Sequence, residues 1–336
     1  MYKNFFGLRD NPFNANPDPR YLFLTQATQE ALAGLTYGIQ SRKGFILLTG
    51  EVGTGKTTLL NRLLDWLNEQ GVATAFVFNS QLDVSQLFDF MLADFGIACE
   101  SRVKSHQLMR LNQWLLERYR SGRTTVLIVD EAQNLSMQVL EEIRLLTNLE
   151  TAREKLLQIV LSGQPELEVK LQDPQLRQLR QRITIRCKTG PLAPEEVDGY
   201  IAERLRIAGA NGQPVFTKEA INAIFKYSGG IPRVTNLLCE HALINSFVDQ
   251  VKPVPASVVQ EVAKEFLLDP PDVAKQHAHA PGKSAPATAA MTPAADGAKS
   301  QAQIAEAFIK TLSDLLEKLN QAQATAPTSA GKGNHE

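Results

Sequence analysis

The sequence predicts an α/β domain followed by a small all-helical domain. Three observations support this prediction: short apolar runs alternate with helical patterns, a glycine-rich loop follows the first run, and the β signal nearly disappears after Leu192. Such alternation is typical of a parallel sheet with helices on both faces. We therefore place the α/β domain at residues 1–192 and the helical domain at residues 193–268.

The individual elements follow in chain order. Residues 1–24 are rich in Asn, Pro and aromatic residues, and their X-Pro steps predict an ordered strap without a helix. Four apolar runs then predict buried strands, at residues 44–50, 72–79, 124–130 and 156–163. Helical patterns surround these runs, at residues 26–39, 57–70, 84–95, 105–120 and 137–149. Four more helices are predicted after Leu192, at residues 194–209, 217–228, 232–249 and 255–268.

The C-terminal part has a different composition. Residues 269–300 are dominated by Pro, Ala, His, Lys and Gly, which predicts a disordered linker, and residues 324–336 predict a disordered tail. Residues 301–323 predict an amphipathic helix whose apolar stripe contains Ile304, Phe308, Leu312, Leu315 and Leu319. This stripe either folds back on the body of the protein or binds a second protein or another copy of the chain.

Composition narrows the class of protein. The chain has 336 residues, 35 Lys and Arg against 36 Asp and Glu, and 43% hydrophobic residues, which excludes a wholly disordered protein and a uniformly positive surface. A local basic patch on the surface is still compatible with this near-neutral net charge. Three separated cysteines, Cys99, Cys187 and Cys239, form no CxxC pair and indicate a reducing compartment. The N-terminus lacks the apolar core of a signal peptide, and no uncharged apolar run reaches about 18 residues, so we expect a cytoplasmic protein without a membrane span.

A phosphate-binding loop is predicted between the first strand and the helix after it, because the sequence there fits GxxxxGK[ST]. Its candidate binding residues are Gly50, Glu51, Val52, Gly53, Thr54, Gly55, Lys56, Thr57 and Thr58. Glycines let backbone N–H groups converge on phosphates, and the helix N-terminus adds partial positive charge. We expect Lys56 to reach the β- and γ-phosphates of ATP and Thr57 to bind Mg²⁺. A glycine-rich turn with a chance lysine is the alternative.

Acidic and polar residues follow two other strands, at the edge where open α/β sheets carry reactive groups. We expect Asp130 to hold Mg²⁺ directly or through water, and Glu131 to polarise the attacking water. Ser162 and Gln164 are both candidates to contact the γ-phosphate or the water, and position favours Gln164. Ordinary solvated strand ends are the alternative for all four residues.

Basic residues cluster after this point, at Arg177, Arg180, Arg182, Arg186 and Lys188. The cluster has three interpretations: a solvated surface, a nucleic-acid patch, or an arginine that reaches the γ-phosphate in a neighbouring subunit. An arginine of the last kind can raise the hydrolysis rate by about 10³ to 10⁵. Arg233, at the start of a predicted helix, could fold over the triphosphate as the domains close.

These motifs in this order resemble those of the AAA+ ATPases, over about residues 1–268. More narrowly, the opening MYKNFFGLRDNPFNANPDPRYLFLT and the stretches LEEIRLLTNLET and LSGQPELEVKL resemble the ExeA family, also called general secretion pathway protein A-like ATPases. The resemblance implies that Lys56 and Thr57 are Walker A residues, and that Asp130 and Glu131 are the Walker B pair. It places Gln164 near the first sensor and Arg233 at the second. It favours Arg182 over Arg180 and Arg177 as the arginine finger, and it implies that the strap from Phe13 to Phe23 lines the adenine pocket.

The resemblance implies an ATP- and Mg²⁺-dependent ATPase that assembles into rings, with a hexamer as the expected size. It would serve a secretion, pilus or exopolysaccharide export system of the cell envelope, at the inner membrane as a peripheral protein, and bind an assembly protein through the C-terminal helix. As a departure, we expect a disordered linker and one amphipathic helix where members of this family often continue into a membrane helix and a peptidoglycan-binding domain. A DNA-binding regulator of the transposition-targeting or origin-recognition type is the alternative, and a nucleotide-gated scaffold is a third hypothesis.

Overall fold

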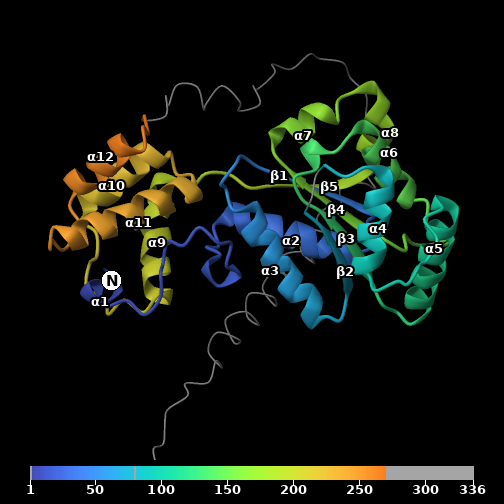
Figure 1. Cartoon of the computed structure of the whole chain (residues 1–336), viewed down its shortest axis with the longest axis horizontal. Coiled ribbons are helices and arrows are strands. Elements are labelled where there is room, and N and C mark those ends of the chain that lie inside the picture. The colour runs from blue at the N-terminus through green and yellow to red at the C-terminus, as the bar shows by residue number, and fades with distance from the viewer. Residues whose placement is uncertain (1, 79–80, 270–336) are drawn as a thin grey trace, which may run out of the picture. The chain divides into compact units, whose positions relative to one another are not determined.

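A five-stranded parallel sheet forms the centre of the first part of the protein (Figure 1). The computed structural model describes residues 2–78 and 81–269. The strand order is β2-β3-β4-β1-β5. Their bounds are β1 Phe45–Thr49, β2 Ala73–Val77, β3 Thr125–Val129, β4 Gln158–Gly163 and β5 Ile183–Lys188.

Helices cover both faces of the sheet, as the sequence predicted. One face packs against α2 (Gln26–Gln40) and α3 (Lys56–Glu69). The other packs against α4 (Val84–Asp94), α5 (Lys104–Arg120), α6 (Met137–Leu146), α7 (Pro165–Lys170) and α8 (Arg177–Arg182). Because both faces are covered, every residue of the central strands β1, β3 and β4 is buried, and most of these residues are apolar.

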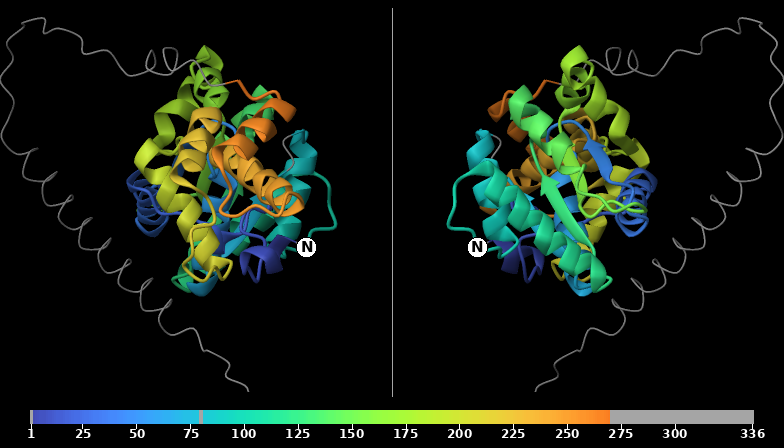
Figure 2. Two further views of the ribbon diagram at one scale, coloured as in Figure 1. Left: turned by 90° about the vertical axis from the view of Figure 1, so that its left-hand side faces the viewer. Right: turned by 90° about the vertical axis from the view of Figure 1, so that its right-hand side faces the viewer.

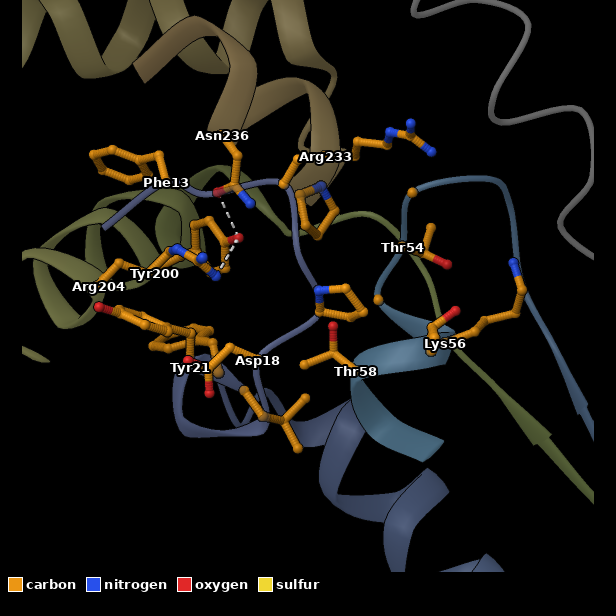
Figure 3. Close-up of a pocket in the computed structure, with 18 of the residues that line it drawn as sticks. Phe13, Asp18, Tyr21, Thr54, Lys56, Thr58, Tyr200, Arg204, Arg233 and Asn236 are labelled. Atoms are coloured by element: carbon orange, nitrogen blue, oxygen red, sulfur yellow. Dashed lines mark hydrogen bonds between the residues drawn. The ribbon is translucent and has the colours of Figure 1, made fainter. Parts of the chain in front are cut away.

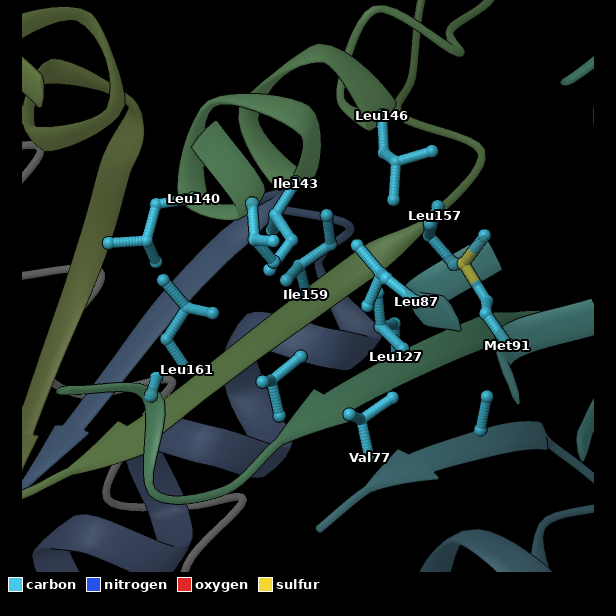
Figure 4. Close-up of a cluster of buried hydrophobic side chains, with 14 of the residues drawn as sticks. Val77, Leu87, Met91, Leu127, Leu140, Ile143, Leu146, Leu157, Ile159 and Leu161 are labelled. Carbon is cyan, nitrogen blue, oxygen red and sulfur yellow. The ribbon is translucent and has the colours of Figure 1, made fainter. Parts of the chain in front are cut away.

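Successive residues of each strand point to opposite cores. In β3, Val126 and Ile128 join the cluster under α2 and α3, whereas Leu127 and Val129 join the opposite cluster. Figure 4 shows this second cluster, in which Leu127 lies with Ile143 of α6 and Met91 of α4. A slip of one residue in strand pairing would exchange these two sets, so the packing specifies the register.

One strand was not predicted from the sequence, which indicated four strands, whereas the described residues form five. The sequence ITIRCK of β5 was treated as part of the basic cluster. β5 is an edge strand, so Ile185 and Cys187 pack toward α2 while Arg186 and Lys188 are exposed. The alternation of apolar and polar residues in this segment was the available signal.

The prediction that residues 1–24 contain no helix was also wrong. Tyr2–Phe6 form a one-turn helix, α1, and Pro19–Tyr21 form a 3₁₀ turn, η1. The apolar side chains of this segment pack with the second domain: Tyr2 and Phe6 are buried in its core cluster, and the Tyr2 hydroxyl donates to Glu240 at 2.8 Å. Packing on a distant part of the chain favours a turn of helix that local sequence does not specify.

The prediction that the described part of the chain after Leu192 is helical is confirmed. This part contains α9 (Pro194–Ile207), α10 (Lys218–Ser228), α11 (Pro232–Val248) and α12 (Ala256–Glu265), which lie together in Figure 2. The chain segment that leads into these helices is held by a hydrogen bond in which Leu192 N–H donates to Gly230 O at 2.8 Å. A Cβ at Gly230 would lie 2.0 Å from Leu192 O, and its φ is +77°, so this contact requires glycine.

The predictions for residues 270–336, including the linker, the amphipathic helix at 301–323 and the tail at 324–336, lie outside the described residues. In the part of the chain that the structure describes, no helix combines the length and hydropathy needed to cross a membrane.

The fold makes a testable prediction for the cysteines. Burial raises the pKa of the Cys187 thiol to about 12, so at pH 8 only about one thiol in 10⁴ is ionised. We expect iodoacetamide to modify the half-buried Cys99 and to leave Cys187 unmodified until the chain is unfolded, as measured by peptide mass spectrometry. Equal rates at the two cysteines in the folded chain would contradict the burial of Cys187.

Candidate nucleotide-binding site

The glycine-rich loop joins β1 to α3 in a conformation that needs its glycines. Gly53 and Gly55 have φ values of +81° and +93°, in the left-handed region that favours glycine. A Cβ at Gly50 would lie 2.1 Å from Thr189 Oγ1, just beyond β5. Thr54 donates to Glu51 O at 2.8 Å and so accepts from Thr189 Oγ1, also at 2.8 Å. The loop is therefore fixed to the end of β5.

Lys56 lies in the first turn of α3 and is 6% exposed. Its Nζ donates to Gly50 O at 2.8 Å and to Glu51 O at 3.0 Å. Burial lowers the pKa of Lys56 from its usual value, and the nearby Glu131 and Asp130 carboxylates oppose this shift. Phosphate oxygens would supply the close negative charge that a buried ammonium needs.

Asp130 follows β3 and collects donors from three directions. Its Oδ1 accepts from Ser162 Oγ at 2.7 Å and from Glu131 N–H at 2.9 Å. The Thr57 hydroxyl donates to Oδ2 at 3.4 Å. A hydroxyl and a carboxylate oxygen are the hard ligands that Mg²⁺ prefers, and Mg²⁺ keeps several waters beside one or two protein ligands. The residues present therefore fit the predicted Mg²⁺ site.

Glu131 is held by two amide side chains. Gln164 Nε2 donates to its Oε2 at 3.1 Å, and Gln133 Nε2 donates to the same oxygen at 2.5 Å. The two residues predicted at the end of β4 to contact the γ-phosphate or the water therefore have different partners. Ser162 donates to Asp130, and Gln164 donates to Glu131. Gln133 was not among the predicted site residues, although it lies within the DEAQ stretch directly after β3.

A cavity of about 590 Å³ opens beside the loop and is lined by the N-terminal segment, the loop and the helical domain. In Figure 3, Thr54, Lys56 and Thr58 lie at one end, and Tyr21 and Tyr200 lie at the other. The wall contains residues from Phe13 to Phe23, the segment predicted to line the adenine pocket. The cavity therefore has one end lined by the glycine-rich loop and one aromatic end.

Arg204 forms the centre of the aromatic end and is 6% exposed. Its guanidinium carbon lies 4.6 Å from the ring centroid of Tyr21 and 5.3 Å from that of Tyr200. Its Nε donates to Pro12 O at 2.6 Å, which ties α9 to the N-terminal segment. The buried Tyr21 hydroxyl has no hydrogen-bond partner among the described residues, so this end has an unsatisfied polar atom. No motif in the sequence pointed to this group.

Arg233 lies at the start of α11 and contacts the glycine-rich loop directly. Its N–H donates to Gly53 O at 3.1 Å, and a Cβ at Gly53 would lie 2.7 Å from Arg233 Cβ. The residue also lines the cavity. The second domain therefore touches the loop at the residue predicted to sense the nucleotide.

The three finger candidates differ in their surroundings. Arg182, the candidate favoured by the resemblance, donates from Nη1 to Arg144 O at 3.2 Å, to Asn148 Oδ1 at 2.9 Å and to Thr147 Oγ1. These are groups at the C-terminal end of α6 in its own chain. Arg177 and Arg180 are exposed. Arg182 therefore forms hydrogen bonds within its own subunit, whereas Arg177 and Arg180 lie exposed on the surface.

Comparison with known proteins agrees with this geometry. Residues 39–171 match the family described as an AAA domain. The chain is 46% identical over 248 residues to general secretion pathway protein A of Aeromonas hydrophila, covering 74% of this chain and 45% of that protein. The chain therefore spans less than half the length of this relative.

Two solved structures show a similar fold. The ORC2 protein of Aeropyrum pernix, solved as ADPNP and ADP complexes, has a TM-score of 0.58 and 15% identity, over 76% of this chain and 71% of that one. Drosophila ORC bound to DNA has a TM-score of 0.60 and 20% identity, over 80% of this chain and 66% of that one.

The parallel sheet, the glycine-rich loop and the matched domain define the chain as an AAA-type P-loop NTPase. Within this class the chain is similar to general secretion pathway protein A over the 248 matched residues, in agreement with the resemblance seen in the sequence motifs.

The site predicts a specific loss of nucleotide binding in Lys56→Ala. At a nucleotide concentration 100 times Kd, binding stabilises a protein by about 2.7 kcal/mol. We expect Lys56→Ala to lose most of the thermal stabilisation by Mg·ATP because the buried ammonium is removed. Lys188→Ala is the matched control, since Lys188 ends the neighbouring strand β5 but pairs with Glu168 at 3.2 Å. An unchanged thermal shift in Lys56→Ala would refute the assignment of the loop.

Proposed function

We propose that the protein binds Mg·ATP and hydrolyses it to ADP and phosphate in an oligomeric assembly that acts as a motor or switch for a cell-envelope system. One observation carries this proposal: Lys56, the Thr57–Asp130 pair and Glu131 converge at one edge of the sheet, beside a cavity of about 590 Å³. A cavity of this size suits a small ligand.

The residues divide the work of phosphoryl transfer. Lys56 and the backbone N–H groups of the loop bind the phosphates, and Thr57 and Asp130 hold Mg²⁺, which neutralises phosphate charge when bound. Ser162 fixes the Asp130 carboxylate through its 2.7 Å hydrogen bond. Glu131 accepts a proton from the attacking water and so orients it for in-line attack.

Two residues connect this chemistry to the rest of the protein. Gln164 shares an oxygen of Glu131 with Gln133, so a γ-phosphate that draws Gln164 away would change the environment of the base. Arg233 joins the loop to α11 through the bond between its N–H and Gly53 O. We propose that these residues report nucleotide state to β4 and to the helical domain.

Assembly into rings would supply an arginine from a neighbouring subunit. We propose that this arginine is Arg180 or Arg177, because both are exposed on α8 or at its start, and that Arg182 stabilises α6 within its own subunit. The heterologous contact of a closed ring places such a surface of one copy against the site of the next.

Mixing variants identifies the arginine. Glu131→Gln alone should bind ATP and lose on the order of 10²-fold or more in turnover, because the base is absent. When Glu131→Gln is mixed with the variant that lacks the arginine acting in trans, turnover should return. The Glu131→Gln subunit then supplies the arginine to a site in a neighbouring arginine-variant subunit, which still has the base Glu131. Steady-state phosphate release from pairs with Arg177→Ala, Arg180→Ala and Arg182→Ala measures this. Rescue of Arg182→Ala alone, at unchanged thermal stability, would overturn our choice.

The cellular role rests on similarity to general secretion pathway protein A. We propose a role in assembling a secretion, pilus or exopolysaccharide export system, with the protein at the cytoplasmic side of the inner membrane. The stripe Ile304, Phe308, Leu312, Leu315 and Leu319 would bind the assembly partner. Removal of residues 270–336 should then abolish recruitment and leave ATP hydrolysis intact.

A DNA-binding regulator is the second candidate function. Exposed basic residues favour it: Arg177, Arg180, Arg186 and Lys188 lie within twelve positions. Phosphate contacts make affinity fall steeply with salt, by a slope of about 0.9 per contact. Fluorescence anisotropy with labelled duplex DNA between 50 and 200 mM salt, roughly the range over which such contacts are lost, separates the candidates. Steep salt-dependent binding that Arg186→Ala weakens would favour this function, and absent binding at low salt would exclude it.

A further inference from the structure

Gln133 lies in the turn after β3, and both ends of its carboxamide are bonded. Its Nε2 donates to Glu131 Oε2 at 2.5 Å, and its Oε1 accepts from Gln164 N–H at 3.1 Å. A backbone N–H only donates and an ionised carboxylate only accepts, so the two partners fix the orientation of the amide. Glutamate at this position would set two carboxylates against each other, and an apolar residue would lose both bonds.

The surrounding residues leave room for this side chain and hold its backbone. A Cβ at Gly163, the last residue of β4, would lie 2.7 Å from Gln133 Oε1, so a side chain at this position would displace the carboxamide. On the other side, Lys170 Nζ of α7 donates to Gln133 O at 2.9 Å and to Leu135 O. The turn after β3 is therefore fixed to both β4 and α7.

Glu131 itself has an unusual backbone. Its φ is 51° and its ψ is 36°, in the left-handed region that residues with a Cβ seldom adopt. Such conformations persist where the surrounding structure imposes them, and they cluster at functional sites. Both amide donors reach Oε2 of this residue. Oε1 is then the oxygen that can take a proton from water.

We propose that Gln133 is a positioning residue for ATP hydrolysis: it anchors Glu131 Oε2 to the end of β4 and thereby directs Oε1 toward the attacking water. Gln133 acts through Glu131, whose chemistry it does not replace. The inference rests on the proposed function, because it assigns a role within the same site.

Gln133→Met tests the proposal, since methionine has a similar length and forms no comparable hydrogen bond. We expect kcat to fall on the order of tenfold to a hundredfold, because an unrestrained base is oriented less often. KM and Mg·ATP affinity should change less than twofold, since Gln133 bonds to Glu131 and Gln164 N–H and not to the glycine-rich loop. Gln138→Met, at an exposed glutamine of α6, is the matched control and should retain full kcat.

Gln133→Met introduced into the Glu131→Gln variant distinguishes a positioning role of Gln133 from a purely structural role. We expect less than a twofold further loss there, measured by single-turnover hydrolysis of radiolabelled ATP, because the residue acts through Glu131. If Gln133→Met does not fold, Gln133→Glu keeps the acceptor for Gln164 N–H and should lower kcat at least as much.

Three results would overturn the inference: an unchanged kcat in Gln133→Met, an equal loss in both backgrounds, or a parallel rise in KM with lower thermal stability. Each requires that the parent chain hydrolyses ATP, so each leaves the proposed function standing. A folded parent chain that binds but does not hydrolyse ATP under all conditions overturns the proposed function, and this inference with it.

Discussion

The parallel pairing of β3, β4 and β1 is the constraint on which the site depends. Val129 lies opposite Leu161, and Thr49 lies opposite Gly163, so the three strands end at the same edge. The residues that follow these strands are therefore brought together although they are distant in sequence. The two hydrophobic cores hold this register, because a shift by one residue would exchange the side chains that pack into each of them.

Charge balance at this edge explains how the site is prepared for a ligand. Lys56 is buried, and its ammonium bonds to loop carbonyls near the Asp130 and Glu131 carboxylates. The carboxylates are in turn oriented by neutral donors from Ser162, Gln133 and Gln164. Neutral donors fix the direction of a carboxylate without cancelling its charge. The contact of Gly53 with Arg233 then links the loop to the helical domain.

Sequence reasoning was sufficient where a motif or an uninterrupted apolar run specified the structure. The loop from Gly50 to Thr57, the acidic pair and the helical second domain all have local signals of this kind. Sequence reasoning failed where tertiary packing, and not local sequence, determines the structure of a segment. β5 is half exposed and rich in Arg and Lys, and Tyr2–Phe6 become helical against the second domain. The surroundings of Gln133 and Arg182 could not be predicted, because their partners just after β4 and at the end of α6 are brought near by the fold.

The central claim is that the loop around Lys56 and the acidic end of β3 bind one magnesium triphosphate. Calorimetric titration of the purified chain with ATP and with AMP, each with and without Mg²⁺, tests it most directly. The account predicts binding at a single site that requires the triphosphate and is strengthened by the metal, with ATP preferred over AMP by more than about tenfold, or 1.4 kcal/mol. A folded chain that gives no heat with Mg·ATP, or that binds AMP as tightly, would contradict the account.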